Sequence, residues 1–218
     1  MIALFTDYDR TITDSQLELC NEVINEITRL RRSQGLKFIV ASGRTLEFLQ
    51  GRLSGYVDGI VAENGAIIYY DGKKEVFGKE ESEQIKGALL ELKDLVYFGE
   101  VIVYALKDAE PQIVNALRIK NVNYAIEKNK NSIMIMPKFI NKGFGILKIA
   151  ERMGLSNAKK IAIGDDENDI SMFRAVDLPV AIGNSDSRLR AIAKAFVEKE
   201  YCDGVLEFLK QINMYNFV

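Results

Sequence analysis

The sequence predicts an α/β protein: a doubly wound parallel sheet with a small α+β segment inserted into it. Two observations support this prediction. Short apolar runs end abruptly in acidic or polar residues and alternate with amphipathic helical patterns, as is typical of parallel strands buried on both faces. Between residues 78 and 138 this alternation is replaced by a different mixture of strands and helices, so we expect a separate small domain there.

The first part of the chain contains three strands separated by two helices. Gly35 stands where the first helix should close, because glycine tolerates the left-handed conformation of a helix C-terminus. Thr45 stands where the second helix should begin, because its hydroxyl can accept a bond from a free backbone N–H. We expect strands at 2–5, 37–41 and 57–62 and helices at 15–33 and 45–53.

A hairpin and the inserted segment follow. Asp71-Gly72 predicts a tight turn between strands at 66–70 and 75–77, because these residues tolerate positive φ. Inside the insertion we expect helices at 80–94 and 109–120 and strands at 100–106, 122–126 and 132–136. The predicted organisation is a catalytic core of residues 1–77 and 139–218 with an α+β domain at 78–138.

The alternation of strands and helices resumes after the insertion. Clusters of Gly, Asp and Ser lie at the carboxyl ends of the predicted strands, where open α/β sheets bind their ligands. We expect strands at 160–163, 178–182 and 196–197. One helix should span 141–153, a second should follow the residues 164–169 and end at 175, and two more should begin at 185 and at 203.

The composition excludes several classes of protein. The chain has 218 residues, 48% apolar and 28% charged, which is typical of a globular protein. It contains no histidine, which excludes Ser-His-Asp triads, His-ligated zinc sites and imidazole acid–base groups. The formal net charge of −2 gives no electrostatic reason to expect nucleic acid or an anionic membrane as a partner. The sequence carries no signal for the oligomeric state.

The cysteines and the apolar runs indicate a soluble, cytoplasmic protein. Cys20 and Cys202 are too few for a disulfide framework or a four-thiolate zinc site, so we expect two reduced, buried thiols. Neither has an arginine at the spacing of a cysteine-dependent phosphatase. Residues 1–5 lead directly into polar sequence rather than into a signal peptide, and no apolar run approaches the roughly 18 residues of a membrane span.

Asp7 and Asp9 follow the first predicted strand directly. A carboxylate there can attack phosphorus to form an aspartyl-phosphate, and a second one can protonate the leaving alkoxide and later activate water. An isolated Asp-x-Asp pair is more typical of a solvated loop after a strand. The functional interpretation therefore depends on the rest of the chain.

A second acidic cluster, residues 164–169, lies at the turn from a predicted strand to a helix. Carboxylates this close repel one another unless a cation neutralises them, and Mg²⁺ prefers such oxygen ligands. The alternative is an acidic helix N-terminus favoured by the helix dipole, which fits Asp166 or Glu167 well. It fits Asp165, at the tip of the strand, less well.

Ser42 and Lys142 are weaker signals. Ser42 follows a strand and can donate a hydrogen bond to a phosphoryl oxygen, although a turn serine would look the same. Lys142 lies in the first turn of a predicted helix, where the dipole disfavours a cation unless lysine and helix together face an anion. Otherwise it is one of several surface lysines.

Together these motifs closely resemble the haloacid dehalogenase superfamily of phosphohydrolases. The match consists of Asp-x-Asp-x-Thr at 7–11, then Ser42, Lys142 and Gly-Asp-x-x-Asn-Asp at 164–169, in this order along the whole chain. The insertion resembles the C2 cap of the Cof-type (IIB) branch, and Asn-Gly-Ala at 64–66 resembles a turn of that branch. In length and cap size the chain looks most like the archaeal-type phosphoglycolate phosphatases.

The resemblance implies a Rossmann-like core, a Mg²⁺ ion and an aspartyl-phosphate intermediate. By it, Asp7 is the nucleophile and a metal ligand, and Asp9 is the general acid/base and reaches the metal through its backbone carbonyl. Asp165 completes the metal site, with Asp169 supporting it. The residues expected to bind substrate phosphate are Ser42, Gly43, Lys142 and Asn168.

One position departs from the superfamily pattern. The residue after Asp9 is usually glycine, and here it is Arg10, which either helps to hold phosphate or points into solvent. In the insertion, Tyr104, Tyr124 and Met134 either face the substrate or, as is more typical of such residues, pack in the core.

The expected substrate is a small phosphorylated metabolite, and the first candidate is 2-phosphoglycolate, hydrolysed to glycolate and phosphate. A small cap leaves limited room, which favours a small acid over a larger ester. The alternatives are a sugar-phosphate phosphatase, a phosphomutase of the same superfamily and, from another class, a non-catalytic phosphate- or metal-binding module.

Overall fold

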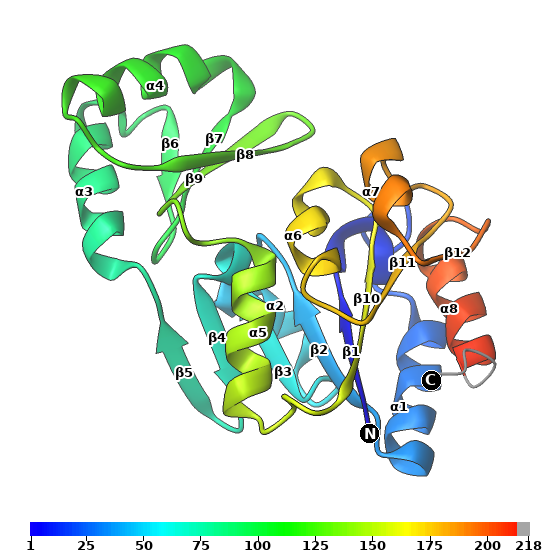
Figure 1. The fold of residues 1–218 in the computed structure, drawn as a ribbon. Helices are drawn as coiled ribbons and strands as arrows, with labels where there is room; N and C mark the ends of the chain where they lie inside the picture. The colour runs from blue at the N-terminus through cyan, green and yellow to red at the C-terminus, as the bar shows by residue number, and fades with distance from the viewer. Residues whose placement is uncertain (213–218) are drawn as a thin grey trace.

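Two sheets organise residues 1–212, the part of the chain that this computed structural model describes, leaving out the side chain of Asn129 (Figure 1). The larger sheet has eight strands in the order β12-β11-β10-β1-β2-β3-β4-β5. The neighbours from β12 to β3 pair in parallel, and β4 and β5 add an antiparallel hairpin at the edge. The strands are β1 Ile2–Thr6, β2 Lys37–Ala41, β3 Gly59–Ala62, β4 Ile67–Tyr70, β5 Lys73–Val76, β10 Lys159–Gly164, β11 Leu178–Ala181 and β12 Ala195–Phe196.

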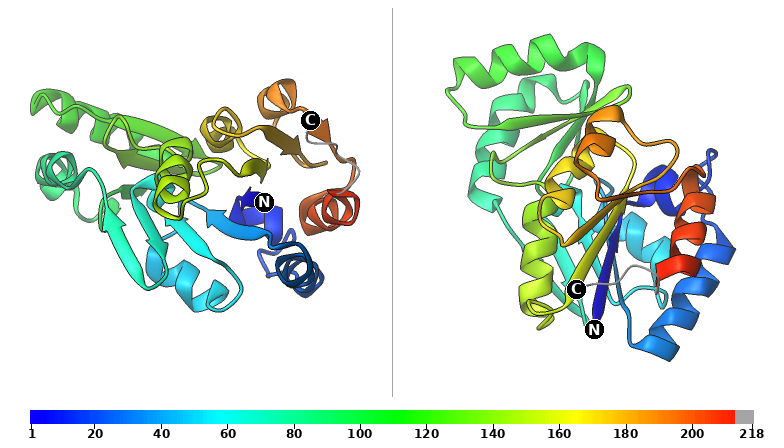
Figure 2. Two further views of the ribbon diagram at one scale, coloured as in Figure 1. Left: turned by 60° about the horizontal axis from the view of Figure 1, so that its bottom comes forward. Right: turned by 45° about the vertical axis from the view of Figure 1, so that its right-hand side comes forward.

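Helices cover both faces of the large sheet, which confirms the doubly wound fold (Figure 2). α1 Asn21–Gln34, α2 Leu46–Leu53 and α8 Tyr201–Gln211 pack on one face. The other face is covered by α5 Lys142–Arg152, α6 Ile170–Phe173 and α7 Ser187–Ile192. Within residues 1–212, no helix is both long and apolar enough to cross a bilayer.

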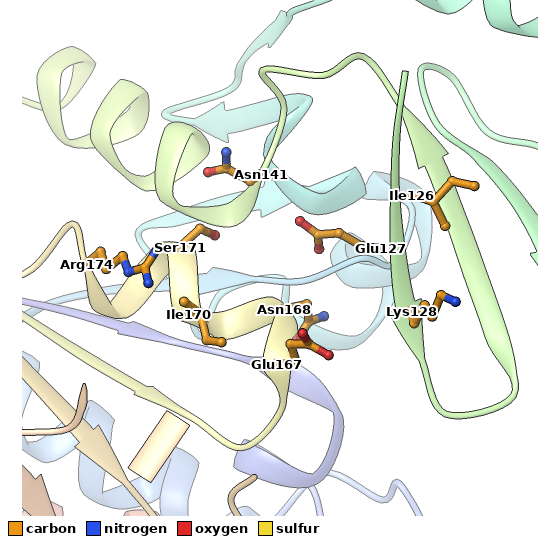
Figure 3. Close-up of a pocket in the computed structure, with 9 residues that line it drawn as sticks. All are labelled: Ile126, Glu127, Lys128, Asn141, Glu167, Asn168, Ile170, Ser171 and Arg174. Atoms are coloured by element: carbon orange, nitrogen blue, oxygen red, sulfur yellow. The ribbon is translucent and has the colours of Figure 1, made fainter. Parts of the chain in front are cut away.

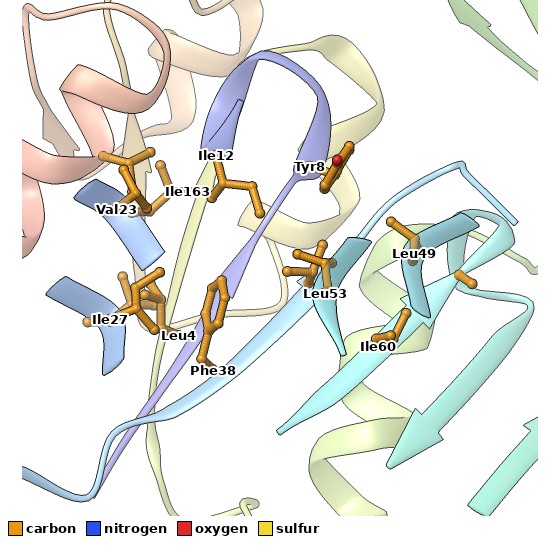
Figure 4. Packing of buried hydrophobic residues seen from close by; sticks show 14 of the residues in the cluster. Leu4, Tyr8, Ile12, Val23, Ile27, Phe38, Leu49, Leu53, Ile60 and Ile163 are labelled. Carbon is orange, nitrogen blue, oxygen red and sulfur yellow. The ribbon is translucent and has the colours of Figure 1, made fainter. Parts of the chain in front are cut away.

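The central strands are apolar throughout because both of their faces are buried. In β1, Leu4 faces the cluster under α1, α2 and α8, whereas Ala3 and Phe5 face the opposite cluster. In β2 the same alternation holds for Phe38 and Ile39. Figure 4 shows Leu4 and Phe38 with the helical side chains that pack on them.

The second sheet is antiparallel, with the order β6-β7-β9-β8. α3 Lys79–Leu89 and α4 Glu110–Ile119 cover one face of it. From the opposite face, Met134 and Met136 pack into the core cluster of the large sheet. This face therefore lies toward the carboxyl ends of the large sheet's strands (Figure 1). The strands are β6 Val96–Phe98, β7 Val103–Leu106, β8 Ala125–Asn129 and β9 Ser132–Met136.

Three local signals of the sequence are confirmed. Gly35 ends α1 in the left-handed conformation, with φ of 64°. The side chain of Thr45 caps α2 by accepting a bond from the backbone N–H of Phe48, at 3.4 Å. Asp71 and Gly72 both have positive φ, 48° and 72°, in the turn between β4 and β5.

The first helix is shorter than predicted, since α1 begins at Asn21 rather than near residue 15. Residues 15–20 form a loop in which Asp14 Oδ1 accepts hydrogen bonds from the backbone N–H of Gln16 and Glu18. These bonds compete with helix formation and leave Leu17 at φ of 67°. The structure also has the three-residue edge strand β6, which the sequence analysis missed.

The expectation of two reduced thiols was wrong. Cys20 and Cys202 form a disulfide, with their Cα atoms 6.2 Å apart. They are separated by 182 positions in the sequence, but Cys20 precedes α1 and Cys202 lies in α8, and these helices pack side by side. Sequence separation alone did not indicate this proximity.

Candidate active site

Lys142 is the centre of the predicted site. Its side chain has no exposed surface, and its Nζ lies 2.7 Å from Asp7 Oδ1 and 2.7 Å from Asp169 Oδ1. A fully buried ammonium is costly unless carboxylates partner it. This arrangement excludes the alternative that Lys142 is a surface lysine.

Neighbouring segments hold these three residues in place. Asp7 follows β1, and its backbone N–H bonds to the carbonyl of Ile163 in β10, at 3.0 Å. Asn141 caps α5 by accepting from the N–H of Phe144, which orients the helical turn that carries Lys142. At Gly143 a Cβ would lie 2.3 Å from the carbonyl oxygen of Ser171, so α5 can approach α6 this closely only with glycine there.

The structure brings three of the predicted acids together. Asp7, Asp165 and Asp169 each offer a carboxylate oxygen within 4.8 Å of the others. With the ammonium of Lys142, these three carboxylates leave two negative charges in a buried volume, which suits a divalent cation with a preference for oxygen ligands.

The pKa values of this cluster reflect the crowding of like charges. Burial, together with the nearby charge of Asp169, raises the pKa of Asp165 to about 7. Burial also raises the pKa of Asp7 well above its ordinary range, and the Lys142 ammonium opposes this only in part. For Lys142, burial alone lowers the pKa, but the attraction of Asp169 and Asp7 outweighs it and keeps the ammonium charged.

Asp165 and Asp169 also accept hydrogen bonds from the protein. Asp169 Oδ2 accepts from the backbone N–H of Asp165 at 3.0 Å and of Asp166 at 3.2 Å. Asp165 accepts from Thr11 Oγ1 at 3.1 Å and from Asn184 Nδ2 at 3.0 Å. Asp169, which is fully buried, therefore binds the backbone of the loop after β10 as well as Lys142. Asp165 keeps a small exposed surface.

The carboxylate of Asp9 has a different partner. Arg44 donates to both of its oxygens, from Nε at 3.0 Å and from Nη2 at 2.7 Å. The guanidinium also lies 4.9 Å from the ring centroid of Phe48. This two-point contact fixes the direction of the Asp9 side chain.

A cavity of about 330 Å³ opens above these residues, between the large and the small sheet. Ser42, Gly43 and Asn168, the three other predicted phosphate-binding residues, all line it with Asp7 and Asp9. Asn168 is buried, and its Oδ1 has no hydrogen-bond partner within the described part of the chain. Such a buried, unsatisfied polar atom is available to a ligand.

The small sheet contributes side chains to the same cavity. Tyr104 lines it and donates a hydrogen bond from its hydroxyl to the carbonyl of Gly43, at 2.8 Å. Met134 lies so close to Gly43 that a Cβ there would be 2.7 Å from its sulfur. Tyr124, in contrast, packs with the cluster under α3 and α4. Of the three residues that the sequence left open, Tyr104 and Met134 thus face the cavity.

A second cavity, of about 410 Å³, lies between β8, α5 and α6 (Figure 3). Glu127 points into it from β8, and Ile126 points to the opposite side of the strand. Glu127 accepts a hydrogen bond from Asn64 Nδ2 at 2.7 Å, which links the small sheet to the core.

Three residues near this site were not predicted from the sequence. Asn184 lies three residues after the end of β11, next to Gly183, so the polar residues at the strand ends could have identified it. Arg44 and Glu127 could not be identified in this way. Arg44 lies two residues after Ser42, which had already been taken as the functional residue at that strand end, and Glu127 lies in the insertion.

The chain is similar to known proteins over nearly all of its length. A family model described as haloacid dehalogenase-like hydrolase matches two overlapping stretches, residues 4–112 and 98–209. Phosphoglycolate phosphatase 2 of Saccharolobus solfataricus is 30% identical over 227 residues, covering 99% of this chain and 94% of that protein.

Solved structures share the fold. A crystal structure from Thermoplasma acidophilum superposes with a TM-score of 0.83 at 18% sequence identity, covering 98% of this chain and 99% of that one. A sugar phosphatase of haloacid dehalogenase subclass IIB superposes with a TM-score of 0.78 at 19% identity, covering 98% and 100%. From the family match and the relative that spans the whole chain, we conclude that the chain belongs to the haloacid dehalogenase-like hydrolases, as its motifs predict, and is a phosphatase.

Proposed function

We propose that the chain hydrolyses a small phosphorylated acid, in the first place 2-phosphoglycolate, through an aspartyl-phosphate on Asp7 and with a bound Mg²⁺. The observation that carries this proposal is the buried cluster of Asp7, Asp165 and Asp169 beside Lys142, of which Asp7 also lines the main cavity. The relative named phosphoglycolate phosphatase supports the choice of substrate.

Asp7 and Asp165 are the residues that we expect to hold the cation. Asp169 already accepts bonds from Lys142 and from two backbone N–H groups, so its role is to orient its neighbours. When bound, Mg²⁺ supplies the positive charge that lets an anionic carboxylate approach an anionic phosphate. The backbone carbonyl of Asp9 is our candidate for a further ligand.

In the first step, an Asp7 oxygen attacks phosphorus, and the bond from phosphorus to the leaving oxygen breaks. For the leaving group to depart as an alcohol, Asp9 has to enter this step protonated, with only one of its oxygens still bonded to Arg44, and its proton then goes to the leaving oxygen. In the second step, Asp9 takes a proton from water as the water oxygen attacks the aspartyl-phosphate. This step restores the Asp7 carboxylate and releases phosphate.

Positive charge and hydrogen-bond donors around the cavity would stabilise the transferred group. Lys142 Nζ, buried beside Asp7, faces the phosphoryl oxygens when substrate is bound. The hydroxyl of Ser42, the backbone of Gly43 and the side chain of Asn168 line the same cavity. Fixed donors of this kind cost no reorganisation when charge moves during the reaction.

We assign residues 78–138 to a cap domain and residues 1–77 and 139–218 to the catalytic core. Tyr104 and Met134 of the small sheet close the cavity over Gly43, which supports this division. A cap in this position excludes water from the aspartyl-phosphate until the leaving group has departed.

A sugar-phosphate phosphatase is the second candidate, because the IIB sugar phosphatase shares this fold over the whole chain. Steady-state phosphate release from 2-phosphoglycolate and from glucose 6-phosphate, with and without Mg²⁺, separates the two candidates. A kcat/KM that is higher for the sugar phosphate would reverse our assignment.

The variant Asp7→Asn tests the mechanism. It removes the nucleophile, so phosphate release should fall roughly a thousandfold or more. Circular dichroism should show an unchanged fold, and Asp94→Asn, an exposed site in the same chain, is the matched control. Asp7→Asn protein that still hydrolyses the ester at near the normal rate would reject the aspartyl-phosphate route.

A further inference from the structure

Two of the cations that line the main cavity lie outside the ion pairs and the acidic cluster described above. Asp9 is paired with Arg44, and Asp7 is paired with Lys142. The two remaining charged side chains that line the cavity, Arg10 and Lys130, are both cations. Within the described part of the chain, neither of them forms an ion pair.

The backbone of Arg10 is held firmly in an uncommon conformation. Its φ is 59°, its N–H donates to Thr13 Oγ1 at 2.7 Å, and its carbonyl accepts from Asn184 Nδ2 at 3.0 Å. A left-handed conformation is unfavourable for a long side chain, and such strain clusters at functional sites. Asn184 also bonds to Asp165, so the position of Arg10 is coupled to the acidic cluster.

Lys130 approaches the same cavity from the opposite side. It lies in the turn between β8 and β9, also with positive φ, 51°. Figure 1 shows this hairpin extending from the small sheet toward the carboxyl ends of the core strands. Arg10 from the core and Lys130 from the small sheet thus border one cavity from two domains.

The acidic groups nearby are already engaged. A neighbouring cavity of about 510 Å³ is lined by Arg10 and Lys130 as well, together with Lys107 and several acids. Of these acids, Glu167 and Asp186 pair with Arg188. Asp166 accepts from a backbone N–H at the start of its own helical turn, and Asp165 belongs to the buried cluster. None of these acids forms an ion pair with Arg10 or Lys130.

We propose that Arg10 and Lys130 bind a second anionic group of the substrate, the carboxylate of a small phosphorylated acid. This inference rests on the proposed function and adds to it the residues that select the leaving group. For the ester phosphate the cavity already offers Ser42 and Asn168, and Lys142 lies beside the proposed nucleophile Asp7, so the phosphate does not require these two cations. A carboxylate bound between them would tie the small sheet to the core and close the cavity on the correct substrate.

The test compares two esters that differ in the second charge. We would measure kcat/KM of the unaltered enzyme for 2-phosphoglycolate and for 2-hydroxyethyl phosphate, its neutral analogue. A charge-assisted contact predicts a preference of about tenfold to a hundredfold for the acid. In Arg10→Gly, whose glycine suits the positive φ, this ratio should fall toward one, mainly through a higher KM for the acid.

Lys130→Asn should lower the same ratio by a smaller amount, because Lys130 is more exposed than Arg10. Asparagine also tolerates the left-handed conformation, so the turn should be retained. Lys93→Asn, at an exposed position of the insertion, is the control and should keep the full preference. Glycolate should inhibit the unaltered enzyme more strongly than it inhibits Arg10→Gly.

The possible failures are distinguishable. If no phosphate is released from either ester or from p-nitrophenyl phosphate, the proposed function itself is wrong. If both esters are hydrolysed equally well, or if Arg10→Gly lowers both values by the same factor, the function stands and the inference is overturned. A marked preference for a bisphosphate over 2-phosphoglycolate would overturn the assignment to a carboxylate.

Discussion

The pKa of Asp165 gives the acidic cluster a measurable property. Because burial and neighbouring carboxylates raise this pKa to about 7 and raise that of Asp7 as well, protons compete with a cation for these oxygens. Below pH 7 the protonated form of Asp165 dominates and weakens metal binding, and above it the Asp165 carboxylate is free to bind.

We therefore expect the dissociation constant for Mg²⁺ to fall as pH rises from about 5 to 8. The fall should be up to about tenfold per pH unit for each proton that metal binding releases. Isothermal titration calorimetry in buffers of different ionisation enthalpy measures both the affinity and the proton release. Asp165→Asn should bind Mg²⁺ weakly at every pH. An affinity that is constant across this range would contradict the assignment of Asp165 as a ligand.

Arg44 has a positioning role that can be tested separately. Without its two hydrogen bonds, Asp9 is free to rotate away from the leaving oxygen. In Arg44→Ala we expect kcat to fall about tenfold to a hundredfold for alkyl phosphates and less for p-nitrophenyl phosphate, whose leaving group hardly needs a proton. Arg44→Lys should restore part of the loss, and the exposed Arg32→Ala is the control. Equal losses for both kinds of ester would indicate a merely structural role.

At this scale the sequence predicted best the residues that follow buried strands. Asp7, Asp165 and Ser42 come directly after strands whose apolar character is unmistakable, so the topology of a parallel sheet brings them to one edge. The contact from Arg44 to Asp9 could not be predicted, because it depends on a side-chain direction that no periodic pattern encodes.

At the scale of elements, the loop before α1 carries one of the two cysteines of the disulfide. Residues 13–20 are not helical, and Cys20 at their end is joined to α8. The sequence predicted both helices but not that they pack together, because helix periodicity gives the buried face of each helix and not its neighbour. For that reason the cysteines were wrongly taken as two separate thiols.

The disulfide predicts a stability that depends on redox conditions. A cross-link between residues so far apart in the sequence restricts the unfolded chain strongly. Replacing both cysteines by serine should lower the free energy of unfolding by about 2–5 kcal/mol, measured by urea denaturation. A reductant should destabilise the unaltered protein by a similar amount and leave the double variant unchanged. Two titratable thiols in the denatured, unreduced protein would contradict the cross-link.

At the scale of the whole molecule, a few polar contacts set how the small sheet sits on the core. The buried carboxylate of Glu63 accepts hydrogen bonds from the backbone N–H groups of Glu100, Val101 and Ile102, at 2.8–2.9 Å. Tyr104 bonds to Gly43, and Glu127 bonds to Asn64. The sequence predicted an inserted domain from the change of rhythm. It could not predict these contacts, because each joins residues that are far apart in the chain.

The burial of Glu127 between the small sheet and the core should make the stability of this arrangement depend on pH. Burial raises the pKa of Glu127, and the hydrogen bond from Asn64 opposes this only in part. Since the pKa is higher in the folded state than in the unfolded chain, the group favours folding at low pH, and this contribution is lost as pH rises through the raised pKa.

Glu127→Gln retains an acceptor for Asn64 but cannot ionise. Between pH 5 and pH 8 we expect the melting temperature of the unaltered protein to fall relative to that of Glu127→Gln, as followed by circular dichroism. The exposed Glu91→Gln should keep the pH dependence of the unaltered protein. If the melting temperatures of the unaltered protein and of Glu127→Gln change in parallel over this range, then ionisation of Glu127 does not destabilise the folded protein.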